Sequence, residues 1–361
     1  LRLNVPTNWD NSLIENISSF PVECIYGKLE EDLIGGGRPT SALPKVTKEH
    51  AEEHIKLAHE NGIAFNYLLN SACLGNLEYS DGYNQKILEY LAWIEGAGVD
   101  YVTVSIPYLI EVVKKRFPRL KIVASVFSHI ESIQQAQFYQ SLGADEIVVV
   151  QSQNRNFEYL SKISKAIKNL QVIVNNGCLL GCPYRRYHAN INSHASQSQR
   201  QVKSIPVDYP VSSCWRARLK DPSEIIKSPW IRPEDLHYYE EVGIDKFKLS
   251  GRTKTTEWIT NAVKAYAERR YNGNLFDILS LPHGKGSISR QKNMPLVDVE
   301  VDNNMLNDFI PFFMNHDCSS TVCSQCGYCI SIAEKAVRID PEEAKLAIER
   351  YNDSVEGLIW R

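Results

Sequence analysis

Cysteine thiols are the side chains of this chain with the clearest capacity for chemistry, because thiolates bind zinc and iron–sulfur clusters. The 361-residue sequence holds nine cysteines, an odd number with irregular spacing. Seven of them form two groups, which are Cys178, Cys182 and Cys214, and Cys318, Cys323, Cys326 and Cys329. The first residues have a strand pattern rather than a signal-peptide pattern, which argues against a disulfide framework. We therefore expect metal ligation in a reducing, cytoplasmic setting.

The first cysteine group follows a predicted strand that ends at Asn175. Cys178 and Cys182 have C-x3-C spacing with flanking glycines, and such a loop can wrap closely around a metal cluster. A cubane iron–sulfur cluster uses four thiolates, or three with one iron left open. The best fourth candidate is Cys73, which follows another predicted strand, and Cys24 or an open or non-cysteine position are the alternatives. Small buried cysteines in a tight turn remain the purely structural explanation.

The second cysteine group has the spacing C-x4-C-x2-C-x2-C within residues 318–329. Two successive C-x2-C steps resemble one side of ferredoxin ligation and favour a second 4Fe–4S cluster. Zinc is the alternative, although zinc sites more often use two C-x2-C pairs separated by a longer spacer. The C-x3-C-x2-C pattern of radical-SAM enzymes is missing, because Pro183, Tyr184 and Arg185 follow Cys182.

Cationic and polar side chains gather at the expected carboxyl ends of the strands. Arg38 follows a run of three glycines, whose backbone amides together with the guanidinium suit an anion. Arg185 and Arg252 suit bidentate binding of a carboxylate or phosphate, and His188 suits proton donation. Further polar residues at these positions are Asn70, Ser105, Asn175, Asn176, Arg186 and His194. Each one alone is equally well explained as a solvated or structural residue, so the set carries the expectation.

Eight apolar, β-branched segments alternate with amphipathic helical patterns such as Asn84–Gly96 and Ile130–Leu142. The predicted strands are Leu1–Thr7, Val22–Lys28, Ile63–Asn70, Tyr101–Pro107, Lys121–Phe127, Glu146–Val150, Gln171–Asn175 and Lys246–Ser250. Gly98, Gly143 and Gly243 each open a Gly-x-Asp step before a strand, where a left-handed glycine can end the preceding helix. The alternation predicts an α/β fold of the TIM-type (β/α)8 class, with chemistry at the carboxyl ends of the strands. A doubly wound open sheet is the alternative, although no Gly-x-Gly-x-x-Gly motif follows the first strand.

Three parts are expected along the chain. They are a barrel over residues 1–271, an irregular connection over 272–307, and a Cys-rich iron–sulfur segment over 308–361 docked on the barrel. The residues that mark the connection as irregular are Pro282, Gly284, Gly286 and Pro295. The last part has little apolar sequence and a short predicted helix from Pro341, so a metal cluster and contact with the barrel must supply its stability.

Other patterns in the sequence exclude several functional classes. The net charge is −3, without the broad basic excess typical of nucleic-acid binding. The longest apolar stretches are far shorter than the roughly 20 residues that cross a bilayer, so no membrane association is expected. His50 and His54 belong to an H-x-x-E-H pattern found in some zinc peptidases, but the helix that carries them would cover the outside of the barrel. No G-x-S-x-G nucleophile motif is present.

Taken together, these features resemble peptidase family U32, over roughly residues 1–270. The motifs that carry the resemblance are Ile25-Tyr26-Gly27, Gly36-Gly37-Arg38, the Gly-x-Asp steps and Asn176-Gly177-Cys178. The family was first labelled as collagenase-like proteases, and other members are oxygen-independent hydroxylases of ubiquinone precursors or RNA that carry a 4Fe–4S cluster on four cysteines. The resemblance implies that Cys178, Cys182 and Cys214 are cluster ligands. The chain departs from the family pattern in lacking His-Gly-x-x-Cys before the first ligand and a fourth cysteine between Cys214 and Cys318.

The most concrete functional expectation is an iron–sulfur oxidoreductase that performs oxygen-independent hydroxylation or a related group transfer. Its substrate would be a small or RNA-linked anion held by Arg38, Arg185 and Arg252, with His188 as an acid. A C-terminal cluster would pass electrons or cap the site. The expected partners, besides the substrate, are an electron-donor protein or another U32-like protein.

Two other classes remain open at this stage. A U32-type peptidase or other hydrolase needs a nucleophile–base pair or an open catalytic zinc, and neither is convincing in the sequence. A zinc- or cluster-stabilised RNA-binding protein would use Arg185, Arg186 and Arg216, and its affinity would depend strongly on salt.

Overall fold

A closed barrel of eight parallel strands lies at the centre of the computed structural model, which describes residues 1–205, 207–282, 284–288, 295 and 297–360. The strands follow one another in sequence order, and β1 pairs with both β2 and β8 to close the ring. They are β1 (Arg2–Pro6), β2 (Val22–Gly27), β3 (Ala64–Leu69), β4 (Tyr101–Val104), β5 (Lys121–Ala124), β6 (Glu146–Val148), β7 (Leu170–Ile173) and β8 (Lys246–Lys248). The TIM-type prediction is confirmed, and the open doubly wound sheet is wrong.

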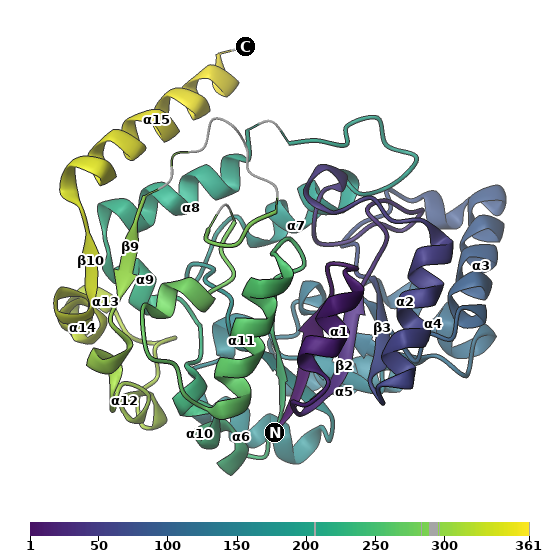
Figure 1. The fold of residues 1–361 in the computed structure, drawn as a ribbon, viewed down its shortest axis with the longest axis horizontal. Helices are drawn as coiled ribbons and strands as arrows, with labels where there is room; N and C mark the ends of the chain where they lie inside the picture. The colour runs from purple at the N-terminus through teal and green to yellow at the C-terminus, as the bar shows by residue number, and fades with distance from the viewer. Residues whose placement is uncertain (206, 283, 289–294, 296, 361) are drawn as a thin grey trace.

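Helices follow the strands and cover the outside of the barrel (Figure 1). The helices of the first six units and of the last unit are α1 (Asn11–Ile17), α2 (Lys48–Glu60), α3 (Asp81–Gly96), α4 (Pro107–Arg116), α5 (Ile133–Leu142), α6 (Phe157–Ala166) and α11 (Thr256–Glu268). Short 3-10 turns are η1 (Thr40–Ala42), η2 (Leu77–Tyr79), η3 (Val126–Ser128), η4 (Gln151–Gln153), η5 (Pro233–Asp235), η6 (Leu275–Ile278) and η7 (Asn303–Leu306).

Strand and helix ends differ from the predicted ones by a few residues, for local reasons. The strand predicted to reach Pro107 stops at Val104, because Pro107 is the first residue of α4 and fits the start of a helix. The helix predicted from Ile130 begins only at Ile133, where Ser132 and Gln135 form a capping box. Local capping chemistry, rather than hydrophobic periodicity, therefore sets these ends.

The three Gly-x-Asp steps have the predicted left-handed glycines. The φ angles are 84° at Gly98, 118° at Gly143 and 90° at Gly243. At Gly143 a β-carbon would also lie 2.7 Å from Cγ of Lys114, so both conformation and space favour glycine. These turns bring the chain from the end of α3, α5 and the helix before β8 straight into the next strand.

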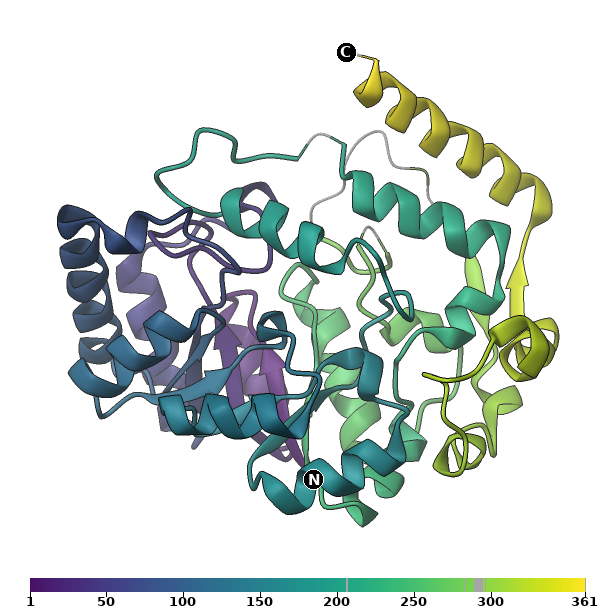
Figure 2. The same cartoon turned by 180° about the vertical axis from the view of Figure 1, so that it is seen from behind.

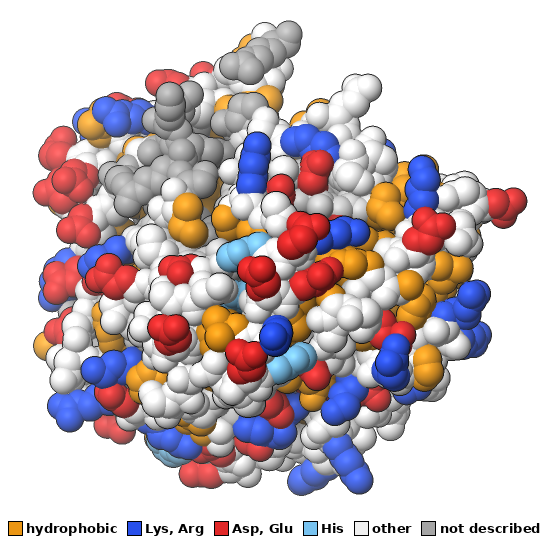
Figure 3. All heavy atoms as spheres, turned by 45° about the vertical axis from the view of Figure 1, so that its right-hand side comes forward, with side chains coloured by type: hydrophobic (Ala, Val, Ile, Leu, Met, Phe, Trp, Pro, Cys, Tyr) orange, Lys and Arg blue, Asp and Glu red, His pale blue; other side chains and the backbone are white. Residues whose placement is uncertain are grey.

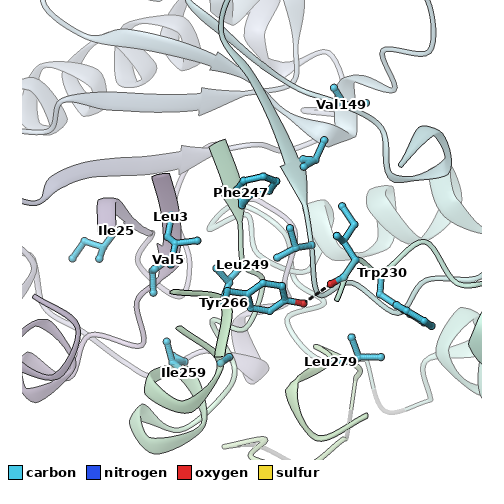
Figure 4. Close-up of a cluster of buried hydrophobic side chains, with 14 of the residues drawn as sticks. Leu3, Val5, Ile25, Val149, Trp230, Phe247, Leu249, Ile259, Tyr266 and Leu279 are labelled. Atoms are coloured by element: carbon cyan, nitrogen blue, oxygen red, sulfur yellow. Dashed lines mark hydrogen bonds between the residues drawn. The ribbon is translucent and has the colours of Figure 1, made fainter. Parts of the chain in front are cut away.

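A continuous hydrophobic core joins the barrel wall to the outer helices. Figure 4 shows Leu3, Val5 and Phe247 near the barrel wall, with Tyr266 beside them. The hydroxyl of Tyr266 donates a 2.8 Å hydrogen bond to the carbonyl of Ile231. Inside the barrel, Lys246 forms a buried ion pair with Glu146. These are the first residues of β8 and β6, so the pair closes the end of the barrel opposite the carboxyl ends of the strands.

A long insertion separates β7 from β8. It contains α7 (Arg185–His194), α8 (Tyr209–Lys220), α9 (Ser223–Lys227) and α10 (Leu236–Glu241). Helix α7 lies across the carboxyl ends of the early strands, since Ser193 and Ser196 contact the loops after β3 and β2. The insertion therefore carries residues far apart in sequence to the mouth of the barrel.

The C-terminal part packs on this insertion rather than standing apart. It contains β9 (Val299–Val301), α12 (Pro311–Met314), α13 (Cys323–Cys326), α14 (Tyr328–Ala336), β10 (Val337–Ile339) and α15 (Pro341–Ile359). Strands β9 and β10 pair antiparallel, and α14 contacts α9 while α15 runs beside α8 (Figures 1 and 2). Helix α15 has 19 residues, so the expectation of a short helix from Pro341 is wrong.

The connection predicted over 272–307 contains η6, β9 and η7. Residues 283, 289–294 and 296 of that stretch lie outside the described residues. Among the described residues no helix is both long enough and apolar enough to cross a bilayer. On the face shown in Figure 3, acidic and basic side chains are interspersed, as the near-balanced net charge of −3 leads one to expect.

Candidate functional site

Three thiols meet beside the carboxyl end of β7. Cys178 lies in the loop after the strand, Cys182 lies just before α7, and Cys214 lies on α8. Burial raises the pKa of each thiol, and each thiol has another of the three among the charged neighbours that raise its pKa further. Thiols that influence one another electrostatically lie close together, so the structure brings the predicted trio into one place.

Two guanidinium groups accompany the thiols. Arg218 is 2% exposed, donates to the carbonyl of Gly177 and forms a hydrogen bond with Cys214 that opposes the rise of its pKa. Arg185 donates a 3.1 Å hydrogen bond to Oγ of Ser152. One buried terminal nitrogen of each guanidinium has no hydrogen-bond partner within the described chain. Unpartnered buried N–H groups beside thiols suit an additional anionic group at this point.

The donor set determines which metal group this arrangement fits. Within the described residues, no three Cys, His, Asp or Glu side chains form a group ready to hold a single metal ion. A cubane cluster attaches its thiolates to separate irons, so they stand further apart than the thiolates around one zinc ion, whose Zn–S bonds are about 2.3 Å. Soft thiols beside unpartnered guanidinium N–H groups fit an anionic thiolate-bound metal group, such as an iron–sulfur cluster.

The remaining cysteines of the barrel have different surroundings. Cys73 lies in the loop after β3, where its sulfur accepts a 3.2 Å hydrogen bond from the amide of Gly75. It is not among the main charged neighbours of Cys178, Cys182 or Cys214. Cys24 is 4% exposed within β2. Three of the predicted ligands are thus charged neighbours of one another, and the proposed fourth, Cys73, is not among these neighbours.

A small cavity of about 90 Å³ opens at the mouth of the barrel. Three cations line it: Arg38 from the loop after β2, Lys248 from the end of β8, and Arg252 just beyond. The amides of Gly35 and Gly36 donate to Asp32 and Ser196, so these two amides serve the loop itself. The contribution of the glycine-rich loop to the cavity is therefore the Arg38 guanidinium.

The electrostatics of this cavity favour an anion. Burial lowers the pKa of Lys248 to about 8, and burial together with Arg38 lowers the pKa of Arg252 to about 10. Lys248 lies 4.2 Å from the ring centre of Tyr26, and no described side chain forms an ion pair with it. One nitrogen of Arg252 is buried without a hydrogen-bond partner. Buried cations that repel one another are stabilised when an anion binds between them.

The cation-lined cavity and the cysteine loop are directly connected. Asn176 lines the cavity, and its side-chain oxygen accepts a 2.9 Å hydrogen bond from the amide of Cys178. Asn70, which was predicted at this edge, also lines the cavity with a buried side-chain oxygen that lacks a partner. Asn175 has a structural role, since its amide group bonds the carbonyls of Ser250 and Ile278.

His188 lies on the other side of Arg38. Both residues line a neighbouring cavity of about 100 Å³. The Nε2 atom of His188 is 3.3 Å from a carboxylate oxygen of Asp208, and the histidine side chain remains 30% exposed. A histidine held by a carboxylate and open to a cavity can exchange protons with a bound molecule.

Arg185 lies on the opposite rim, in a third cavity of about 300 Å³ that also contains Cys182 and His129. Burial, Arg185 and Arg186 lower the pKa of His129. The four predicted polar residues therefore divide between two sides of the cysteine loop. Arg38, Arg252 and His188 share one side, and Arg185 lies on the other.

The C-terminal cysteines line a further cavity of about 270 Å³. Cys318, Cys323, Cys326 and Cys329 are all on its wall, together with Leu180 and Gly181 of the barrel cysteine loop. Burial and the other three thiols raise the pKa of Cys329 to about 11, while the nearby Arg155 opposes this rise. The sulfur of Cys326 is 3.8 Å from Nε2 of His316. All four predicted ligands thus line one cavity, and Gly181 also lines the cavity that contains Cys182.

The H-x-x-E-H pattern on α2 has a structural role. His54 is fully buried, with Nε2 2.8 Å from Oγ1 of Thr7 and Nδ1 2.7 Å from Oδ1 of Asn11. Burial lowers its pKa to about 4. The Thr7–His54–Asn11 arrangement resembles a nucleophile, base and orienting group. None of these residues lines the cavities described above, and the hydroxyl of Thr7 also accepts from the amide of Trp9.

Four residues of the site were not predicted from the sequence: Lys248, His129, Arg155 and Arg218. Lys248 had a usable signal, because a lysine within the short strand ending near Ser250 lies two residues from Lys246 and shares its inward face. The other three lie in loops or helices whose packing depends on residues far away in sequence, and no local pattern distinguishes them.

Comparisons with known proteins agree with the observed fold. The model of the family described as "Peptidase family U32" matches residues 41–177 and so ends one residue before Cys178. A protein of Methanocaldococcus jannaschii named "Uncharacterized protease MJ1657" is 31% identical over 315 residues, which are 85% of this chain and 87% of that protein. The solved structure of the U32 peptidase Mk0906 covers 69% of this chain and 92% of its own, with a TM-score of 0.53 and 21% identity, a likeness of fold. This chain therefore belongs to peptidase family U32.

Proposed function

We propose that this protein is an iron–sulfur oxidoreductase that performs oxygen-independent hydroxylation, or a related group transfer, on an anionic substrate. The observation that carries the proposal is the link at Asn176. This residue lines the cation-rich cavity and holds the amide of Cys178, so a substrate anion and a cluster on Cys178, Cys182 and Cys214 would be neighbours.

Arg38, Lys248 and Arg252 would bind and orient the anion from three directions. Their cavity is small and their charges are incompletely paired, so a carboxylate or phosphate group gains strong charge-assisted hydrogen bonds there. His188, held by Asp208, would donate or accept a proton at Nε2 on the far side of Arg38. Arg185 and the exposed Arg186 would contact a larger substrate, such as RNA, along the opposite rim.

A cluster bound to the thiols would supply one-electron redox chemistry. When water is the oxygen source, replacing C–H by C–OH releases two electrons and two protons. The two electrons need an oxidant, and a second centre on Cys318, Cys323, Cys326 and Cys329 would pass them one at a time to an electron-acceptor protein. Gly181 lines both the cavity of the C-terminal cysteines and the cavity that contains Cys182, so the two centres would lie on neighbouring cavities.

The test is iron, sulfide and zinc analysis after strictly anaerobic purification. We expect about eight irons per chain, four for each cubane cluster, and about four in each of Cys178→Ala and Cys326→Ala. Cys24→Ala is the matched control, because this leftover cysteine lies inside β2 and should leave the metal content unchanged. Zinc without sulfide in the native protein would contradict the redox proposal.

Hydrolysis is the second candidate, because the M. jannaschii relative is named as a protease. The buried Thr7–His54 pair would be its most direct source of a nucleophile and base. Peptide cleavage by metal-depleted protein that disappears in Thr7→Val would favour this candidate over the redox function. We expect no such cleavage, since Thr7 is 2% exposed.

A further inference from the structure

Arg155 is a buried cation in the loop between β6 and α6. It is 8% exposed, and its guanidinium lies 4.8 Å from the ring centre of Trp230 and 4.7 Å from that of Phe309. It donates hydrogen bonds of 2.7 Å and 2.6 Å to the carbonyls of Ile226 and Ser228. These contacts fix its position between the barrel and the C-terminal part of the chain.

The charge of Arg155 lacks a carboxylate partner. None of the ion pairs between described residues includes it, and its Nε atom is buried without a hydrogen-bond partner. Asp235 contributes to its electrostatic environment, but both carboxylate oxygens of Asp235 are bound by Arg232 at 2.8 Å. A buried guanidinium that meets only carbonyls and aromatic rings is costly, so a negative group is expected beside it.

The cavity of the C-terminal cysteines supplies such a group. Arg155 lines this cavity together with all four cysteines. The other charged groups on its wall are Lys227, which is paired with Asp221 and Glu224, and Asp317, whose carboxylate accepts from Ser319. Neutral thiols would leave Arg155 uncompensated, whereas metal-bound thiolates would balance it.

We propose that Arg155 is the counter-ion of a thiolate–metal centre formed by Cys318, Cys323, Cys326 and Cys329. The C-terminal part supplies the ligands, and the barrel supplies the positive charge. The identity of the metal as iron–sulfur rests on the function proposed above, but the role of Arg155 requires only that the thiols are held as thiolates.

For an iron–sulfur cluster the consequence is a shifted potential. One-electron reduction adds a negative charge and breaks no bond, and a nearby guanidinium stabilises the more negative form. With dithionite as the electron source, Arg155→Gln should make the cluster harder to reduce, by at least tenfold in the reduction equilibrium, which equals 59 mV for one electron. The measurement is made in Cys178→Ala protein, so that only the C-terminal centre contributes.

A second measurement separates charge compensation from packing. Arg155→Gln should speed loss of metal to a chelator at least tenfold, Arg155→Lys should recover part of the difference, and Arg119→Gln on the surface should have no effect. Thermal unfolding completes a double-mutant cycle with Cys318→Ala/Cys329→Ala. If Arg155 is a counter-ion, Arg155→Gln destabilises the cysteine-containing protein more than the cysteine-depleted one.

The outcomes are distinct from those that test the proposed function. Equal destabilisation in both backgrounds, with unchanged metal loss and potential, would show that Arg155 only packs, and would overturn the inference while the iron–sulfur function stands. Zinc at this centre would end the redox proposal, yet metal retention would still test Arg155. A C-terminal part that binds no metal at all overturns the inference directly.

Discussion

The two cysteine groups are built in opposite ways. The barrel group gathers its thiols from a loop and from the distant helix α8, and it borders a cavity lined by three cations. The C-terminal group takes four thiols from residues 318–329 and borders a cavity lined by aromatic rings, such as those of Phe312 and Tyr328, by the ion-paired Lys227 and by the buried cation Arg155. Two of the four C-terminal thiols, those of Cys323 and Cys326, are exposed, whereas Cys178 is the exposed one among the three thiols of the barrel group.

This difference indicates that the two cysteine groups are suited to different functions. A centre beside several incompletely paired cations is suited to bind an anion and act on it. A centre that is partly exposed, stacked against aromatic rings and formed by a short segment is suited to exchange electrons with a partner protein. Under the proposed function, the barrel group would be the substrate end and the C-terminal group the electron end, with Gly181 lining a cavity at each.

The largest expected difference between the two groups concerns metal removal. A chelator should take metal first from the C-terminal centre, because two of its thiols are exposed. Bound metal contributes roughly 10 kcal/mol or more to small thiolate sites, so we expect α13, α14 and α15 to become susceptible to proteases while the barrel stays resistant. Mass spectrometry of the fragments measures this. Simultaneous loss of both metals and of barrel resistance would mean that the two regions are a single unit.

The next effect concerns anion binding at the barrel mouth. Arg252→Gln should weaken the affinity for sulfate about 10- to 100-fold, since a hydrogen bond to a charged group contributes roughly 1.5–3 kcal/mol. Arg252→Lys should retain part of the affinity, and Arg116→Gln on the exposed end of α4 should retain all of it. Calorimetry gives the affinities. Equal binding by the native and Arg252→Gln proteins would place the anion elsewhere and remove the distinction between the two ends.

A smaller effect concerns pH. Lys248, whose pKa is lowered to about 8 by burial, is a cation below that pH and neutral above it. Sulfate affinity should therefore fall as the pH rises through about 8, on the order of fivefold for roughly 1 kcal/mol. Lys248→Met should bind more weakly at low pH and show a flat profile. A profile that stays steep in Lys248→Met would assign the titration to another group.

The smallest effect concerns Cys73. Its sulfur accepts a hydrogen bond from the amide of Gly75, and Cys73 is not among the charged neighbours of the other three barrel thiols, so Cys73→Ser should leave the iron content and the cluster spectrum unchanged. Cys182→Ala is the matched variant that should lose the barrel cluster. Loss of iron in Cys73→Ser would instead make Cys73 the fourth ligand, as its place after a strand suggested.

The sequence was most informative where function or fold depends on local patterns. Apolar, β-branched segments alternating with helical patterns, together with the Gly-x-Asp steps, sufficed for the barrel, and the C-x2-C spacing sufficed to group the last four cysteines. The length of α15 was missed, because this helix is stabilised through contacts with α8 that lie far away in sequence. Arg155 and Arg218 were missed for the same reason. Each of these arginines can be recognised as important only when the structure shows that its charged group is buried.

The pairing of β9 with β10 has a consequence for how such a protein can be altered. Val301 lies opposite Val337, so the chain enters and leaves the whole cysteine-bearing segment at adjacent points. When the two ends of a segment are held together, a change in its length costs little free energy. Each doubling of the number of residues costs about 0.6 kcal/mol in loop-closure free energy. The segment between these two valines is therefore exchangeable: a different module inserted there would be anchored by the same strand pair, and the surfaces to be redesigned are those around Arg155 and at the contact of α14 with α9.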